Sequence, residues 1–206
     1  MAREDFLVGD CNEAAVKWLD SWGSWPGIGL IVYGPEACGK THLARVWQQQ
    51  AGAEFIKAAD LDNAAAERLV TQNVQNVIVD DLESLAEEEA LFHLYNHLFQ
   101  SKGSLLILAE RPPKRLEIIL PDLRSRLQSL PSAEITLPDE TVLSAVFLKH
   151  FHDRQIMLDA DVLTYILPRI ERSFGEVARL VDLIDKKALA EKRRITVPLV
   201  RDLLRS

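Results

Sequence analysis

Gly34-Pro35-Glu36-Ala37-Cys38-Gly39-Lys40-Thr41 is the stretch that decides the fold, because it matches the pattern G-x-x-x-x-G-K-[ST] in full. An apolar run precedes it at residues 28–33, and a helical pattern follows it at residues 40–50. A strand, a glycine-containing loop and a helix in this order are typical of the phosphate-binding loop of α/β proteins. The sequence therefore predicts an α/β domain with a nucleotide site.

Each fixed position of this loop has a chemical role. Gly34 and Gly39 admit backbone conformations that a side chain would block, so that backbone N–H groups converge on phosphate oxygens at the start of the following helix. Lys40 places an ammonium against the β- and γ-phosphates, and Thr41 offers its hydroxyl to Mg²⁺. The predicted nucleotide-binding residues of this segment are Gly34, Pro35, Glu36, Ala37, Cys38, Gly39, Lys40, Thr41 and His42.

A second acidic element follows at residues 77–81, which read Val-Ile-Val-Asp-Asp. A buried strand that ends in a carboxylate is the usual partner of a phosphate loop. Asp80 is expected to hold Mg²⁺ together with Thr41, directly or through water, and Asp81 to orient a hydrolytic water.

Short apolar runs alternate with longer amphipathic stretches over the first two thirds of the chain. We expect strands at residues 28–33, 54–57, 77–79, 105–108 and 135–137, and helices at 40–50, 61–70 and 87–100. Continuous apolar strands separated by helices indicate a parallel sheet covered on both faces. The expected fold is a doubly wound α/β fold with five parallel strands.

The pattern after Pro138 is helical only, with helices expected at residues 140–154, 160–169, 174–192 and 198–204. In the third of these, apolar residues form one stripe at helical spacing, and Ser173 with Glu176 fits a capping box at its start. We therefore expect an α/β domain at residues 1–137 and a small all-helical lid domain at residues 138–206.

Composition limits the class of protein. The 206 residues carry a formal net charge of −7, which argues against a dedicated nucleic-acid-binding domain. Acidic residues interrupt the basic stretch near the C-terminus, so a solvated helix face is the preferred interpretation. The two cysteines are too few for a disulfide framework, and no apolar run approaches the ~20 residues of a membrane-spanning helix. The expected location is the cytoplasm, without membrane contact.

Several motifs together resemble one family. Residues 6–9 (Phe-Leu-Val-Gly) with Asn12, the phosphate loop, residues 77–81, residues 105–113 (Leu-Leu-Ile-Leu-Ala-Glu-Arg-Pro-Pro) and residues 120–126 (Leu-Pro-Asp-Leu-Arg-Ser-Arg) occur in the order seen in bacterial DnaA-like AAA+ proteins. The resemblance covers nearly the whole chain. Within that family the chain resembles most the Hda (HdaA) group of short DnaA homologues, which inactivate the replication initiator.

This resemblance implies roles for further residues. Phe6, Leu7 and Val8 would line the pocket of an adenine nucleotide, so the implied cofactors are ADP or ATP with Mg²⁺. Glu110 falls on the family's first sensor, which faces the γ-phosphate. Arg126 falls on the arginine finger, which reaches the nucleotide of a neighbouring subunit.

The chain departs from the family pattern at three points. Gly175 stands where DnaA has its sensor 2 arginine, and Arg179, one turn further along the same helix, is the candidate substitute. Residues 1–6 contain no Gln-x-Leu-x-Leu segment of the kind that docks Hda-like proteins on the DNA sliding clamp, which leaves clamp binding open. No DNA-reading helix-turn-helix domain follows Ser206, unlike in a full initiator, so sequence-specific DNA binding is not expected.

The resemblance implies a replication regulator that stimulates ATP hydrolysis by the initiator DnaA, its expected partner, through a trans-acting arginine finger. A helicase loader or other replication factor that works through its own hydrolysis cycle is the alternative, and a nucleotide-locked adaptor is a third. Because AAA+ ATPases commonly have Glu where this chain has the shorter Asp81, slow intrinsic turnover is expected at most. Homo-oligomers are compatible with all three of these functions.

Overall fold

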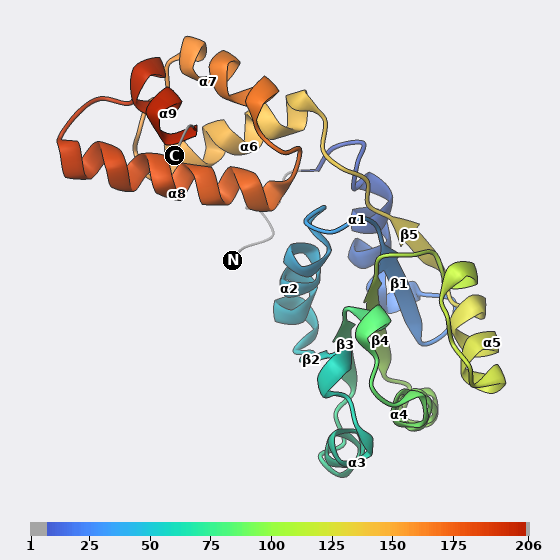
Figure 1. The fold of residues 1–206 in the computed structure, drawn as a ribbon. Coiled ribbons are helices and arrows are strands. Elements are labelled where there is room, and N and C mark those ends of the chain that lie inside the picture. The colour runs from blue at the N-terminus through green and yellow to red at the C-terminus, as the bar shows by residue number, and fades with distance from the viewer. Residues whose placement is uncertain (1–7, 205–206) are drawn as a thin grey trace. The chain divides into compact units, whose positions relative to one another are not determined.

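The structure is a computed structural model that describes residues 8–204. The described residues form two compact units (Figure 1). The α/β unit comprises residues 8–36 and 40–136, and the helical unit comprises residues 137–204 together with 37–39. Within residues 8–204, no helix has both the length and the apolar character that a membrane crossing requires.

A parallel sheet forms the centre of the α/β unit (Figure 1). Its strands are β1 (Gly29–Tyr33), β2 (Glu54–Lys57), β3 (Asn76–Asp80), β4 (Ser104–Ala109) and β5 (Ser132–Glu134), in the order β2-β3-β4-β1-β5. All four neighbouring pairs are parallel. The three central strands are buried along almost their whole length, as expected where helices cover both faces. The predicted doubly wound fold with five parallel strands is thus confirmed.

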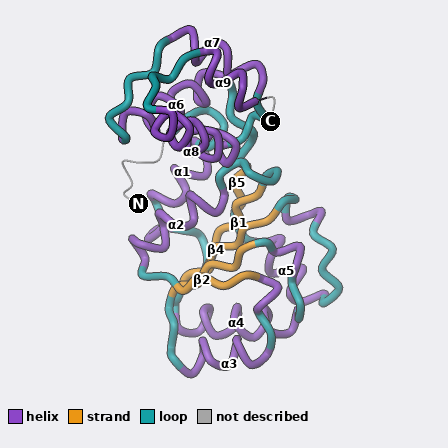
Figure 2. The backbone as a smooth tube through the Cα atoms, turned by 60° about the vertical axis from the view of Figure 1, so that its left-hand side comes forward, coloured by secondary structure: helices purple, strands orange, loops and turns teal. Residues whose placement is uncertain are grey.

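Helices cover the sheet on both faces (Figure 2). The leading helix α1 (Glu13–Asp20) and the phosphate-loop helix α2 (Lys40–Ala51) lie on one side, and α3 (Asn63–Thr71), α4 (Glu88–Ser101) and α5 (Pro121–Ser129) lie on the other. Apolar residues of α3, α4 and α5 form one core with β3 and β4. Short 3-10 helices occur at η2 (Trp22–Ser24), η3 (Ala58–Asp60), η4 (Leu82–Ser84) and η5 (Pro113–Arg115).

The fifth strand was expected at residues 135–137, and this placement is wrong. The strand is β5, three residues earlier, and pairs with β1 from Ile31↔Ser132 to Tyr33↔Glu134. Ala133 and Ile135 are buried while Glu134 and Thr136 are exposed. An edge strand buried on one face alternates in this way, so the apolar run that marks a central strand does not locate it.

The tryptophans of the leading segment pack within the α/β unit. Trp22 and Trp25 lie against Trp47 of α2, with ring centroids 5.6 and 5.7 Å apart. The indole N–H of Trp25 donates to the carbonyl of Trp18 at 2.6 Å, and that of Trp22 to the Ser104 hydroxyl at 2.8 Å. These contacts hold the leading segment against α2.

The helical unit consists of α6 (Glu140–Asp153), α7 (Ala160–Ile166), η6 (Leu167–Arg169), α8 (Phe174–Glu191) and α9 (Val197–Leu204). The apolar stripe expected on α8 is buried. The hydroxyl of Ser173 accepts from the Glu176 N–H at 3.1 Å, which is the expected N-terminal cap. The reciprocal half of the capping box is replaced, since both carboxylate oxygens of Glu176 accept from Arg179 instead.

Candidate functional site

The phosphate loop turns on two residues with positive φ angles, Ala37 at 58° and Gly39 at 104°. Glycine adopts such angles at little cost, whereas in alanine a left-handed backbone costs roughly 1–2 kcal/mol. Backbone strain of this kind persists where the surrounding structure enforces it, and it concentrates at ligand-binding sites. The loop leads directly into α2, whose first residue is Lys40.

Lys40 folds back over the loop that precedes it. Its ammonium donates to the carbonyl of Gly34 at 2.7 Å and to that of Pro35 at 2.8 Å. Both acceptors are neutral. An ammonium held in this way would gain a stronger, charge-assisted contact by turning to a phosphate oxygen.

Thr41 and Asp80 meet, although 39 residues separate them. Thr41 lies in the first turn of α2 and Asp80 ends β3. The Thr41 hydroxyl donates to the Asp80 carboxylate, with Oγ1 3.2 Å from Oδ2 and 3.5 Å from Oδ1. Hydroxyl and carboxylate oxygens are the hard ligands that Mg²⁺ prefers. The residues present therefore fit the metal ion that accompanies a nucleotide.

Asp81 is exposed and has a left-handed backbone, with φ 58° and ψ 61°. Its carbonyl accepts from the Ser84 hydroxyl at 2.7 Å and from the Ser84 N–H at 2.9 Å, which fixes η4 directly after it. Asp81 is therefore the point at which the chain leaves the sheet.

The next acidic residue, Glu83, holds the loop after β4. Its Oε1 accepts from the backbone N–H groups of Glu110 and Arg111 at 2.7 and 3.0 Å. The predicted sensor residue Glu110 is itself exposed, and its backbone is fixed by a residue only three positions after Asp80. The strand end that carries Asp80 is thereby connected to the candidate sensor loop. The sequence gives no signal for this contact, since 27 residues separate Glu83 and Glu110.

Glu88 plays a similar part at the start of α5. Its Oε1 accepts from the Ile119 N–H at 2.8 Å, and its Oε2 accepts from the Leu120 N–H at 2.5 Å. Pro121 then begins α5 with a fixed φ angle. The first turn of α4 therefore sets where α5 begins.

Arg126 projects from α5 onto the aromatic side chains of α4. Its guanidinium carbon lies 5.0 Å from the centroid of the Phe92 ring and 5.1 Å from that of Tyr95. A guanidinium over an aromatic face gains roughly 0.5–2 kcal/mol, depending on its exposure. Arg126 is half-buried, whereas Arg124, two residues earlier, is exposed. The structure thus distinguishes the two arginines, and it adds Phe92 and Tyr95 as partners that sequence reasoning missed.

Arg179 forms a two-point ion pair on the surface of α8. Its Nε lies 2.7 Å and its Nη2 2.8 Å from the two carboxylate oxygens of Glu176. The hydrogen bonds from Arg179 hold the pKa of Glu176 below its usual value, and Glu176 in turn raises the pKa of Arg179. Gly175, at the family's sensor 2 position, is exposed. The described contacts of Arg179 are therefore those of a surface ion pair.

Of the residues expected to line an adenine pocket, Phe6 and Leu7 lie outside the described residues. Val8 is 48% exposed. The neighbouring Gly9 is fixed by Asn12, whose side-chain oxygen accepts from the Gly9 N–H at 3.0 Å. His42 lies half-buried in the first turn of α2.

Two family descriptions match the chain, one in each unit. Residues 46–131 match the bacterial DnaA ATPase domain. Residues 139–204 match the Hda lid domain.

Known relatives and structures agree with these matches. The chain is 26% identical over 226 aligned positions to the chromosomal replication initiator protein DnaA of Campylobacter curvus, an alignment that covers 98% of this chain and 51% of that protein. Domain III of the Thermotoga maritima initiator DnaA has a TM-score of 0.84 at 20% identity, over 98% of this chain and 93% of that one. AMPPCP-bound DnaA from Aquifex aeolicus has a TM-score of 0.75 at 23% identity, over 91% of this chain and 65% of that one. The chain thus spans about half the length of the curated relative.

Proposed function

Because the chain is an Hda-like protein of the DnaA family of AAA+ domains, we propose that it regulates replication initiation by acting on DnaA. In this proposal it binds ADP or ATP with Mg²⁺ and supplies Arg126 to the ATP held by a neighbouring DnaA subunit. The positive charge of Arg126 would stabilise the charge that develops on the transferring phosphoryl group. DnaA would then hydrolyse its ATP faster.

The observation that carries this proposal is the way in which Arg126 is held. A trans-acting arginine must stand ready for a partner, since freezing a long side chain during the reaction would cost free energy. Phe92 and Tyr95 give the guanidinium a fixed support at 5.0 and 5.1 Å without neutralising its charge. Among residues 8–204 no carboxylate forms an ion pair with it.

The nucleotide part of the proposal rests on Lys40, Thr41 and Asp80. Within residues 8–204, Lys40 is held only by neutral carbonyls, and the oxygens of Thr41 and Asp80 lie within hydrogen-bonding distance of each other. We propose that Lys40 binds the phosphates and that Thr41 and Asp80 hold Mg²⁺, which would neutralise phosphate charge when bound. Intrinsic hydrolysis is proposed to be slow, because the side chain of Asp81 is shorter than that of the Glu that AAA+ ATPases commonly have at this position.

A loader that works through its own hydrolysis cycle is the competing function, and the complete phosphate loop is compatible with it. A mixed assay separates the two. ATP hydrolysis by DnaA is measured with and without this chain, in the presence of DNA and the sliding clamp, and the chain is also measured alone. Faster hydrolysis by DnaA supports the regulator, whereas unchanged DnaA with strong hydrolysis by the chain itself supports the loader. We also propose that the sliding clamp is a partner of this chain and that the chain is located in the cytoplasm.

A further inference from the structure

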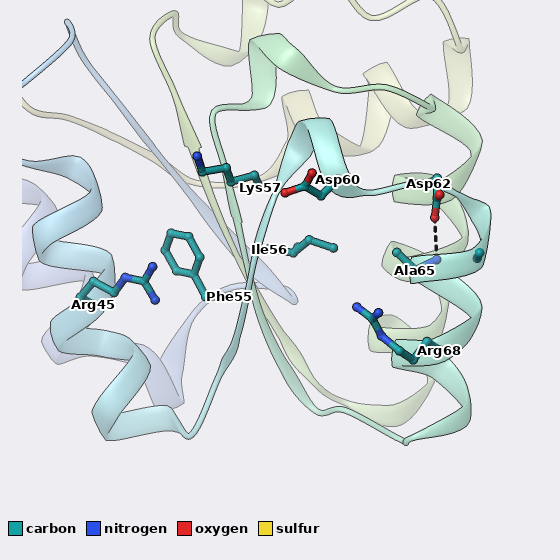
Figure 3. A pocket seen from close by; sticks show the side chains of 9 residues that line it. Arg45, Phe55, Ile56, Lys57, Asp60, Asp62, Ala65 and Arg68 are labelled. Carbon is teal, nitrogen blue, oxygen red and sulfur yellow. Dashed lines mark hydrogen bonds between the residues drawn. The ribbon is translucent and has the colours of Figure 1, made fainter.

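A groove of about 560 Å³ lies beside β2 in the α/β unit (Figure 3). We call it the β2 groove. It is distinct from the candidate nucleotide site, since none of Lys40, Thr41 and Asp80 lines it. Its lining comes from α2 (Arg45), from β2 and η3 (Phe55, Ile56, Lys57, Asp60) and from α3 and its N-cap (Asp62, Ala64, Ala65, Arg68).

The β2 groove runs along the outer edge of the sheet. Successive residues of a strand point to opposite faces, and the close-up view follows this rule (Figure 3). Phe55 lies on the α2 side, where Arg45 stacks over its ring at 3.5 Å, and Ile56 points to the side of α3. A groove lined by both faces must cross the edge between them. β2 is the terminal strand, so this edge forms no ladder with another described strand.

The charges around the groove favour an acidic occupant. Arg45, Lys57 and Arg68 bring three cations to it, and none of them forms an ion pair within residues 8–204. Of the two carboxylates, that of Asp62 is engaged as the N-cap of α3, where it accepts from Ala65 N–H at 2.7 Å. The three cations and two carboxylates of the lining leave it with a net charge of +1, whereas the whole chain carries −7.

We propose that the β2 groove binds an extended acidic peptide segment of a partner protein, which adds to the sheet beside β2. An exposed sheet edge offers a row of backbone donors and acceptors to such a segment. The four residues of β2 span about 13 Å at ~3.3 Å per residue, which matches a peptide of similar length. Single-stranded nucleic acid suits the groove less well, because Arg45 covers the Phe55 ring on which a base would stack.

A labelled acidic peptide of alternating glutamate and valine is the probe for the charge part of the proposal, with binding followed by fluorescence anisotropy at low salt. We expect the double variant Lys57→Glu/Arg68→Glu to weaken binding about tenfold or more, because two attractive charges become repulsive. Lys186→Glu/Arg201→Glu, at exposed positions of α8 and α9, makes the same change in net charge; it is the matched control and should leave binding unchanged. Equal losses in both variants would mean non-specific attraction and would overturn the proposal.

Strand addition has its own readout. With the peptide bound, backbone amides of residues 54–57 that face the groove should exchange their hydrogens more slowly, and a peptide N-methylated at alternate amides should bind at least tenfold more weakly. Equal binding of the N-methylated peptide would overturn strand addition. Binding of a thymidine oligonucleotide that depends on Lys57 and Arg68, with no peptide binding, would overturn the choice of partner. None of these outcomes depends on DnaA.

Discussion

The phosphate loop and helix α5 each present a cation, but the two cations are held by different means. The ammonium of Lys40 rests on neutral carbonyls of its own loop, five and six residues away in sequence. The guanidinium of Arg126 rests on aromatic rings of α4, and α5 itself is anchored by Glu88 from 31 and 32 residues away. The first arrangement leaves the cation free to move to a phosphate within the same unit. In the proposed function, the second fixes a cation in advance for the nucleotide of a neighbouring subunit.

The largest expected effect concerns Arg126, the cation that rests on the aromatic rings of α4. Arg126→Ala should lower the rate at which this chain stimulates ATP hydrolysis by DnaA by about 10³–10⁵-fold, because no other charge replaces the finger. Single-turnover hydrolysis by DnaA measures it. Affinity of the chain for ADP should stay unchanged. Arg124→Ala is the matched control, since this exposed arginine lies on the same helix, and stimulation that survives Arg126→Ala would leave the adaptor function in its place.

The next largest effect is expected at Lys40, the cation that rests on carbonyls of its own loop. Lys40→Ala removes one charge-assisted contact to phosphate, worth roughly 1.5–3 kcal/mol, so ADP affinity should fall about tenfold or more. Isothermal titration calorimetry with Mg²⁺ present measures the change. Unaltered ADP affinity in the Lys40 variant would contradict the assignment of the nucleotide site.

Asp80→Asn should weaken Mg²⁺-dependent ATP binding while leaving the melting temperature of the nucleotide-free protein nearly unchanged.

A smaller effect is expected at Glu83, the carboxylate that connects the strand end carrying Asp80 to the candidate sensor loop. Glu83→Ala leaves the N–H groups of Glu110 and Arg111 without their acceptor, which should cost about 1 kcal/mol because the site is exposed. Hydrogen exchange at these two amides should then speed up roughly fivefold, while Glu83→Gln, which keeps an acceptor oxygen, should restore most of the protection. Equal exchange in all three proteins would mean that Glu83 does not hold the loop.

The smallest effect concerns the surface ion pair of the helical unit. Because Arg179 lowers the pKa of Glu176 in the folded state, the pair contributes stability above the usual Glu pKa, and this contribution is lost as the pH falls through the lower folded value. In Arg179→Ala the pKa of Glu176 should rise back towards its usual value, which NMR titration detects. Arg172→Ala, a change on a different ion pair, should leave that pKa where it is. If Arg179 also replaces the sensor 2 arginine, its loss will lower nucleotide affinity as well.

Features whose signals lie within a few consecutive residues could be predicted from the sequence, whereas contacts between residues distant in sequence could not. The phosphate loop and the strand that ends in Asp80 carry their signals within a few residues, so both were located correctly in the fold. β5 was misplaced because an edge strand need not be continuously apolar. The supports of Glu110 and Arg126 join residues about 30 positions apart, and neither a carboxylate nor an aromatic ring on a helix signals such a partner. The β2 groove was likewise invisible, since it depends on which strand ends the sheet.

The central claim is that this chain acts on the nucleotide of another protein, and one measurement tests it directly. DnaA is loaded with ATP labelled at the γ-phosphate, this chain is loaded with unlabelled ADP, and the release of labelled phosphate is followed after mixing with DNA and the sliding clamp. We expect labelled phosphate to be released faster than from DnaA alone, although the chain has no ATP of its own to hydrolyse. Release of labelled phosphate at the rate of DnaA alone, whether the chain carries ADP or ATP, would contradict it.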